Sequence, residues 1–301
     1  MAPCAIGHPE NIMNTNTNQT PIVATLNHNP LLAAALNRFG TRVANIHAGN
    51  DVLPWSPMMP FVYPGYVSAP FRAFYVGQDT HGWNTGKEGG FSSFLDRFRS
   101  NRIDDYLALN ESALATDDRI GGWKGSTSSF WFRVHQLHLT LRFGKTFGLS
   151  ELGSEHRTAL DEIGYGNRFA VELPAALGKH WKRIDKPLYW QIREAAEIEL
   201  NRFDLILDCF KPELAFIFRW TWDPDERIYF RGLTFKEVGR MVHGYMNAVV
   251  YRVSNGKHTA TVVWTCHPST AWLNKVEPKT SWQEFVSILA GLARQHCPQL
   301  R

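Results

Sequence analysis

Residues 71–83, FRAFYVGQDTHGW, are the stretch on which the predicted fold rests. The apolar run 73–76 has the length and the aromatic and β-branched content of a buried strand. It stops at Gly77, and an amide, a carboxylate, a hydroxyl and an imidazole follow. In an open α/β sheet, ligands bind beyond the carboxyl ends of the strands. The stretch therefore predicts either a strand that presents the carboxylate of Asp79 to a substrate or a strand that ends in an ordinary Asp-containing turn.

A second stretch near the other end of the chain has the same plan. Residues 261–274 are TVVWTCHPSTAWLN, in which the β-type run 262–264 leads into a His-Pro-Ser sequence that begins at His267. Taken together, the strand–Gly-Gln-Asp motif at residues 77–79 and the strand–His-Pro-Ser motif resemble the uracil-DNA glycosylase superfamily. The resemblance covers the chain from residue 71 to the C-terminus. It implies that both motifs lie at strand ends on one side of a central parallel sheet.

Composition indicates a globular chain with a mild basic bias. Of the 301 residues, 44% are hydrophobic and 13% aromatic, which is enough for a sizeable core. Residues 1–28, rich in Asn, Thr and Pro, are predicted to be a disordered or loosely packed arm, and residues 29–301 a single α/β domain.

The net charge of +4 fits a polyanionic partner or an ordinary surface. The basic cluster 178–183, GKHWKR, is interpreted either as a phosphate-backbone contact or as a solvated loop.

Cysteine and histidine spacing predicts no metal site and no cofactor. The four cysteines form no CxxC pair and lack the spacing of an iron–sulfur cluster. Two histidines three residues apart, His135 and His138, are interpreted as packed or exposed side chains rather than as metal ligands. Isolated cysteines without a signal peptide are typical of reduced thiols in the cytoplasm. No apolar run approaches the length of a membrane span, so we expect a cytoplasmic monomer with no membrane partner.

Helical and strand patterns alternate along the chain, which predicts a three-layer α/β/α fold with a mostly parallel central sheet. Besides the two motif strands, β-type runs are predicted at residues 161–172, 214–218 and 248–253, and the Asn255-Gly256 pair predicts a hairpin. Residues 51–66 are predicted to be extended and residues 103–122 to form a polar loop. Helices are predicted at residues 29–40, 93–102, 126–147, 189–210, 235–247 and 281–294.

The chemistry of base removal specifies which residues to look for. Cleaving the bond between a base and deoxyribose builds positive charge on the sugar and negative charge on the departing base. A fixed carboxylate stabilises the sugar or takes a proton from the attacking water. Asp79 is the candidate carboxylate, and His267 is the candidate donor to the base oxygen. The resemblance implies the same roles for these two positions. No feature singles out a lysine for strand cleavage, so we expect a monofunctional glycosylase.

Other polar and aromatic residues are predicted to hold the flipped base. Gln78 would line the pocket through its backbone, and Thr80 would lie beside it. In the uracil branch of the superfamily, an aromatic residue after the Gln-Asp motif stacks on the base, which implies this role for Phe91, with Phe94 as the alternative. Asn167 could read the base edge, because an amide offers one acceptor and two donors.

The residues around the His-Pro-Ser motif are predicted to contact DNA. Ser269 and Thr270 would grip a phosphate through hydroxyl or backbone N–H groups. Trp272 or Leu273 would fill the gap left by the flipped nucleotide, as an apolar wedge does in other proteins, or would pack in the core. His81 is also assigned to the DNA contact.

One departure from the superfamily pattern bears on the substrate. The uracil branch follows its Gln-Asp with Pro-Tyr-His, and that Tyr crowds carbon 5 of the base. Here Thr80 and His81 follow directly. We therefore expect a carbon-5-modified cytosine as substrate, such as the glucosylated hydroxymethylcytosine of phage DNA. Some members of the superfamily act on such bases in antiviral defence.

Two other functions stay open at this point. One is a plain uracil-DNA glycosylase of base-excision repair, and the other is a catalytically silent DNA-binding module. An α/β hydrolase is disfavoured, because the chain has no Gly-x-Ser-x-Gly elbow and no phosphate-binding Gly-rich loop.

Overall fold

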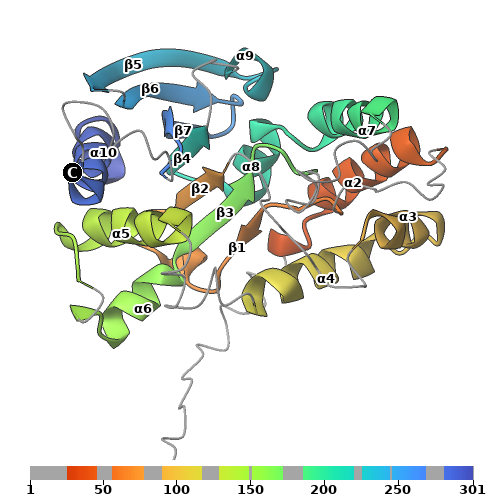
Figure 1. Cartoon of the computed structure of the whole chain (residues 1–301), viewed down its shortest axis with the longest axis horizontal. Helices are drawn as coiled ribbons and strands as arrows, with labels where there is room; N and C mark the ends of the chain where they lie inside the picture. The colour runs from red at the N-terminus through yellow and green to blue at the C-terminus, as the bar shows by residue number, and fades with distance from the viewer. Residues whose placement is uncertain are drawn as a thin grey trace, which may run out of the picture.

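A mixed β-sheet runs through the centre of the computed structural model (Figure 1). The structure describes residues 26–45, 56–77, 90–116, 129–148, 151–171, 186–219, 226–244, 246–268 and 281–300. Within these residues the strands are β1 (Phe61–Val62), β2 (Ala73–Gly77), β3 (Ile163–Asn167), β4 (Leu214–Arg219), β5 (Thr234–His243), β6 (Met246–Ser254) and β7 (Thr259–Cys266). Their order in the sheet is β1-β3-β2-β4-β7-β6-β5.

The parallel part of the sheet is confined to four adjacent strands. β2 pairs in parallel with β3 and with β4, and β4 pairs in parallel with β7. β1 joins β3 antiparallel, and β6 and β5 extend the other side antiparallel. The predicted α/β class is therefore confirmed, whereas the sheet as a whole is mixed. The cause lies partly in the Asn255-Gly256 hairpin, which was predicted and which forces β6 to run opposite to β7.

Helices cover both faces of the sheet (Figure 1). Among the described residues they are α2 (Pro30–Val43), α3 (Phe91–Arg99), α4 (Ile103–Thr116), α5 (Ser129–Phe143), α6 (Ser154–Leu160), α7 (Lys186–Glu199), α8 (Phe203–Phe210), α9 (Glu226–Tyr229) and α10 (Trp282–His296), with short 3-10 turns η1 (Tyr66–Ser68) and η8 (Pro298–Leu300). Alternate residues of β2 enter different cores. Phe74 and Val76 pack with α2, α7 and α8, whereas Ala73 and Tyr75 pack with α5 and α10.

Helix α2 begins where the sequence predicts but does not stop at Gly40. The side chain of Asn29 caps its first turn by accepting a hydrogen bond from the backbone N–H of Leu31. The helix continues to Val43. A Cβ atom at Gly40 would lie 2.3 Å from Cδ2 of Phe98. This glycine therefore lets α3 pack closely against α2 instead of ending α2.

The largest error of the sequence prediction concerns β5, which replaces the helix expected at residues 235–247. The spacing of Phe235, Val238 and Met241 fits a helical face. In the structure these residues form the edge strand of the sheet, paired with β6 and interrupted by a register shift between Glu237 and Gly239. Pairing with an available edge has overridden the local helical pattern.

Two helical segments also differ from the prediction. The expected polar loop after residue 102 is helix α4, which buries Ile103, Tyr106, Leu107 and Asn110 along one side. The single helix expected at residues 189–210 is divided into α7 and α8. The break occurs at Asn201, whose side-chain oxygen accepts a hydrogen bond from Ala170 N–H at 2.7 Å. That bond ties the break to the segment that follows β3.

The end of the predicted N-terminal arm belongs to the folded part. Asn27 is buried and pairs with the backbone of Val62 through two hydrogen bonds of 3.1 and 3.0 Å. His28 lies 2.7 Å from Glu111. The domain therefore begins before residue 29, and residues 1–25 lie outside the described residues.

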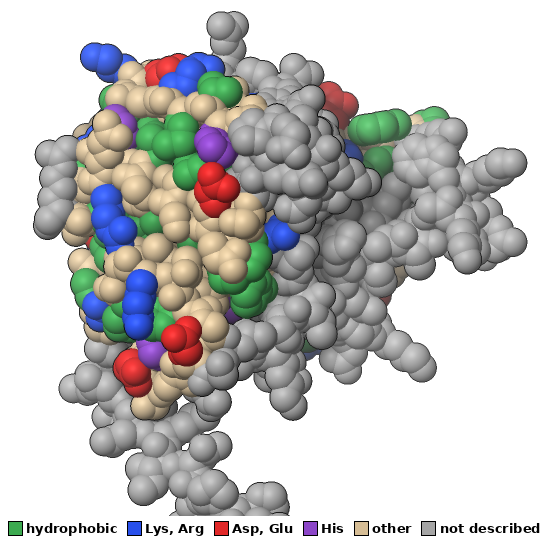
Figure 2. Space-filling model, turned by 60° about the vertical axis from the view of Figure 1, so that its left-hand side comes forward, with side chains coloured by type: hydrophobic (Ala, Val, Ile, Leu, Met, Phe, Trp, Pro, Cys, Tyr) green, Lys and Arg blue, Asp and Glu red, His purple; other side chains and the backbone are tan. Residues whose placement is uncertain are grey.

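The closing helix and its N-terminal cap agree with expectation. Ser281 caps α10 by accepting a hydrogen bond from Glu284 N–H at 3.1 Å. The first residues of the helix predicted at 126–147 lie outside the described residues, and α5 ends at Phe143 before Gly144, whose φ is +84°. Figure 2 shows the side on which α5 and α10 lie, with basic, acidic and hydrophobic side chains interspersed over its described part.

Candidate functional site

The carboxyl edge of the four parallel strands carries the candidate site. β2 ends at Gly77 and β7 ends at Cys266, directly before the two sequence motifs, and β4 lies between them. Of the predicted site residues, Phe91, Asn167 and His267 are described. The others lie outside the described residues: Gln78, Asp79, Thr80, His81, Ser269, Thr270, Trp272 and Leu273.

Backbone hydrogen bonds hold the strand ends level with one another. Gly77 lies opposite Asn167 in the sheet register, and the carbonyl of Gly77 accepts a hydrogen bond from Arg168 N–H at 2.7 Å. On the other side, the N–H of His267 donates to the carbonyl of Arg219 at 2.6 Å. The four strand ends are thus linked in two pairs, β2 with β3 and β4 with β7, so the residues that follow leave the sheet from fixed points.

Asn167 is buried at this edge, and its amide orientation is fixed by neighbours. Its Oδ1 atom accepts a hydrogen bond from the Tyr165 hydroxyl at 2.6 Å, and its Nδ2 donates to the sulfur of Met58 at 3.0 Å. A Cβ atom at Gly77 would lie only 2.6 Å from Oδ1 of Asn167 and 3.0 Å from the Tyr165 hydroxyl. The missing side chain of Gly77 is therefore what allows Asn167 to occupy this position.

His267 lies against an aromatic wall formed mainly by Phe130. The two rings are nearly parallel, at 16°, with centroids 4.9 Å apart. Phe130 in turn contacts Tyr165 and Phe218, with ring centroids 6.2 and 5.7 Å away. His267 is 8% exposed. The first full turn of α5 thus positions the imidazole, and the sequence had indicated Phe130 only as a core residue of a helix.

Phe91, the residue expected to stack on the base, lies elsewhere. It is 1% exposed and packs on Phe39 and Phe94, with ring centroids 6.2 and 5.9 Å away. The alternative, Phe94, is also fully buried and contacts the same Phe39 ring. Both belong to the core that α2 covers, whereas Phe130 belongs to the core that α5 covers. The structure therefore does not bring Phe91 or Phe94 together with His267, and Phe130 takes the place beside it.

Two buried arginines at the same edge were not predicted. Arg168 follows β3 and Arg219 ends β4, and each is 5% exposed. Their guanidinium carbons lie 5.6 and 5.9 Å from the ring centre of Trp264, within the range of cation–π attraction. On α5, burial lowers the pKa of Arg133, which lies near Cys266. Strands and helix thus bring three guanidinium groups to the edge.

His138 belongs to a separate polar network inside the α5 core. Its Nδ1 is 3.0 Å from the Tyr75 hydroxyl, and its Nε2 is 3.8 Å from Glu162. Burial lowers the pKa of His138, although the nearby Glu162 carboxylate acts in the opposite direction. For Glu162, burial acts to raise the pKa, but the nearby His138 imidazole and the hydrogen-bonded Arg142 outweigh it and lower the pKa. This network holds α5 on the sheet, and of the two alternatives left open for His138, packed or exposed, the structure shows the packed one.

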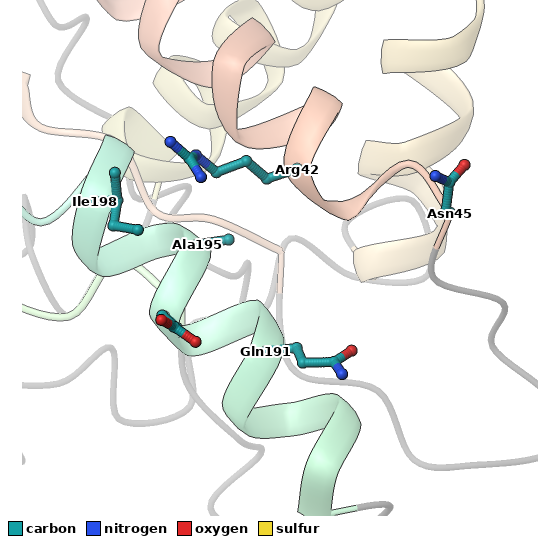
Figure 3. Close-up of a pocket in the computed structure, with 6 residues that line it drawn as sticks. Arg42, Asn45, Gln191, Ala195 and Ile198 are labelled. Carbon is teal, nitrogen blue, oxygen red and sulfur yellow. The ribbon is translucent and has the colours of Figure 1, made fainter.

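A groove of about 400 Å³ lies between α2 and α7. It is lined by Arg42, Asn45, Gln191, Glu194, Ala195 and Ile198. Figure 3 shows Arg42 reaching from α2 towards α7. The Arg42 guanidinium is paired with Glu199 at 2.6 Å, so the groove has mixed charge.

The chain matches no protein-family model, no curated protein and no solved structure in the three comparisons made. Within the described ranges, no cluster of three or more His, Cys, Asp or Glu side chains is placed to hold a metal ion. None of the described helices has both the length and the apolar character required to cross a bilayer.

Proposed function

We propose that the chain is a monofunctional DNA glycosylase whose active site lies at the carboxyl edge of β2, β3, β4 and β7. One observation carries the proposal: the two strands that lead into the Asp79 and His267 motifs run parallel and flank β4. Neighbouring strands lie about 4.8 Å apart, so two strands separated by a third are roughly 10 Å apart. A flipped nucleotide fits between residues that leave the sheet at this separation.

In this proposal Asp79 and His267 act on opposite ends of the bond that breaks. The Asp79 carboxylate stabilises the positive charge that develops on deoxyribose and orients the attacking water. His267 donates a hydrogen bond to the base oxygen on which negative charge accumulates. Stacking on Phe130 limits rotation of the imidazole, and this supports the role because a donor must be positioned before the charge develops.

Asn167 and Phe130 would recognise the base. Asn167 lies at the end of β3, next to Gly77. The hydrogen bond from the Tyr165 hydroxyl fixes the orientation of the Asn167 amide. Phe130 provides an apolar ring at the same edge. The polar edge of a base bound beside these groups would form hydrogen bonds with the Asn167 amide, and its flat side would stack on Phe130.

The proposed substrate is a carbon-5-modified cytosine in phage DNA, which would make the protein an antiviral enzyme. The support is the sequence Thr80-His81 in place of the Pro-Tyr-His of the uracil branch. The Tyr that crowds carbon 5 in that branch is missing after Asp79, which leaves volume for a substituent at carbon 5. We expect the glucosylated form of hydroxymethylcytosine to be accepted along with the unmodified hydroxymethyl base.

The test is base release from a panel of DNA substrates. It contains uracil, thymine, hydroxymethylcytosine and genomic DNA with glucosylated cytosine, and abasic sites are scored by alkaline cleavage. Asp79→Asn and His267→Ala are assayed beside the wild type. We expect abasic sites only in the modified DNA, and losses of roughly 100-fold or more in both variants.

Three other results would change the conclusion. Release of uracil alone would make the protein a repair glycosylase. DNA binding without release of any base would leave a silent binding module. Release that survives both substitutions would place the chemistry outside the proposed site.

A further inference from the structure

A continuous series of alternating aromatic rings and arginines extends from the candidate site to the surface. Starting from Trp264, the Arg168 guanidinium lies 5.6 Å from the indole ring and 5.0 Å from the ring of Phe169. Arg193 lies on Phe169 at 4.1 Å and on Trp190 at 5.8 Å. Each step is within the distance of a cation–π contact. The series begins next to Asn167 and ends on the outer side of α7.

The inner part of this series is held rigidly. The backbone directly after Phe169 is fixed by two hydrogen bonds at Ala170: its N–H donates to Asn201 at 2.7 Å, and its carbonyl accepts from Met58 at 2.8 Å. Arg193 donates a hydrogen bond to the Tyr189 hydroxyl at 2.9 Å. The guanidinium is thereby held in place, and its flat surface contacts several aromatic rings.

The outer end of the series is exposed. Trp190 is 54% exposed, more than the next large aromatic side chains, Phe143 at 39% and Phe235 at 38%. An indole ring on a helix surface, next to a guanidinium that aromatic contacts hold flat, offers a stacking surface with an adjacent positive charge. Proteins that bind single-stranded nucleic acid combine these two elements.

We propose that Trp190 and Arg193 form a binding platform for single-stranded DNA next to the catalytic edge. A base stacks on Trp190, and Arg193 contacts the neighbouring phosphate. The proposal rests on the proposed function, because it takes the DNA that enters the active site to be the strand that continues over α7. It adds a substrate preference: a target base in single-stranded or locally opened DNA is favoured over the same base in a closed duplex.

Charge favours DNA over a protein partner at this surface. Arg168, Arg193 and Arg219 all belong to or adjoin the series. We expect the strand to pass Trp190 on the flank of Arg193, because Glu194 lies one helical turn from Trp190 on the flank that faces the groove and would repel phosphate. At the surface the DNA backbone meets Arg193 beside Trp190, because Arg168 and Arg219 are each only 5% exposed and belong to the buried side of the series.

The experiment measures binding of the full chain to unmodified oligonucleotides by fluorescence anisotropy. Single-stranded and duplex DNA of one sequence are compared for the wild type, Trp190→Ala, Trp190→Phe and Arg193→Gln. Stacking of one base is worth about 1–3 kcal/mol, so Trp190→Ala should weaken single-strand binding by about five- to 150-fold, and Trp190→Phe should retain most of it. Arg193→Gln should reduce the salt dependence of binding by about one phosphate contact.

Phe143→Ala provides the matched control. Phe143 is an exposed ring with an arginine, Arg142, placed 5.6 Å from its centre, and it lies at the far end of α5 from the site. This variant should bind single-stranded DNA like the wild type. Equal single-strand affinity of Trp190→Ala and wild type would overturn the proposal and leave the surface to another kind of partner.

The platform and the glycosylase activity are separate proposals, and different results would overturn each. Loss of single-strand binding in Trp190→Ala, combined with no base release from any DNA, would sustain the platform and overturn the glycosylase. Base release by the wild type, combined with unchanged single-strand binding in the Trp190 variants, would sustain the glycosylase and overturn the platform. Thermal unfolding of each variant shows that the platform substitutions leave the fold intact.

Discussion

At the carboxyl edge of the sheet, aromatic rings contact different kinds of side chain on the two faces. On the α5 face, Phe130 lies parallel to the imidazole of His267. On the α7 face, Trp264 and Phe169 contact the guanidinium of Arg168. Asn167 and Arg168 are consecutive residues at the end of β3, and strand alternation points them to opposite faces. Under the proposed function, hydrogen-bond donation to the base and base recognition lie on one face, and the DNA contacts lie on the other.

The largest expected effect is on the rate of base release, and it distinguishes two histidines on the α5 face, His267 and His138. His267→Ala should lower the single-turnover rate of base release by roughly 100- to 1,000-fold, because it removes a donor to the charge that develops on the base. His138→Asn should leave the rate within about threefold, since an interior residue of the Tyr75–Glu162 network acts only through packing. Equal losses in the two variants would contradict the assignment of His267.

The next effect tests whether Phe130 positions His267. Phe130→Leu keeps an apolar side chain but removes the ring that lies on the imidazole. We expect base release to fall about tenfold, with a loss of stability below about 1.5 kcal/mol because the volume change is small. The rate and urea unfolding are measured on the same preparation. An unchanged rate would mean that Phe130 is only a core residue.

A smaller effect compares two glycines on different faces. Gly77→Ala brings a methyl group against Asn167, and Gly40→Ala brings one against Phe98. Each should cost about 1–3 kcal/mol of unfolding free energy through overpacking. Only Gly77→Ala should also reduce base release at a temperature where both variants are folded. If Gly40→Ala reduced release as much, the effect would reflect general loosening of the fold.

The smallest effect is a pH dependence of stability on the α5 face. Burial lowers the pKa of His138, so the unfolded chain binds a proton that the folded protein does not. The free energy of unfolding should therefore decrease as the pH falls through about 6.5, the pKa of an unfolded histidine. His138→Asn should flatten this decrease, as measured by urea unfolding at several pH values between 7.5 and 5.5. A slope unchanged by the substitution would show that other groups cause the pH dependence.

Much of the fold was predictable because the inner strands carry dense local signals. The buried positions of β2, β4 and β7 are mostly apolar, with Arg219, Thr261 and Thr265 as exceptions, and Asn255-Gly256 specifies the hairpin between β6 and β7. β5 was not predictable, because none of its residues is buried and its first four are exposed, so no alternating apolar pattern marks it as a strand. Its state is decided by β6, a partner that local sequence does not reveal.

The site was predictable where a motif follows a strand and was missed where partners come from distant elements. His267 and Asn167 are found at strand ends, as expected. Phe130 reaches the edge from α5, and Arg219 reaches it as the last residue of β4, and neither belongs to a motif. The spacing argument that selected Phe91 failed, because helix α3 turns this ring into the core beneath α2.

The measurement that tests the central claim most directly is the number of abasic sites formed in DNA containing glucosylated hydroxymethylcytosine. Wild type and His267→Ala are incubated with this DNA and with an otherwise identical unmodified DNA. We predict that the wild type forms abasic sites in the modified DNA alone and that His267→Ala forms them at least about 100-fold more slowly. Equal rates for the two proteins, or no abasic sites with a fully folded wild type, would contradict a glycosylase site at this edge of the sheet.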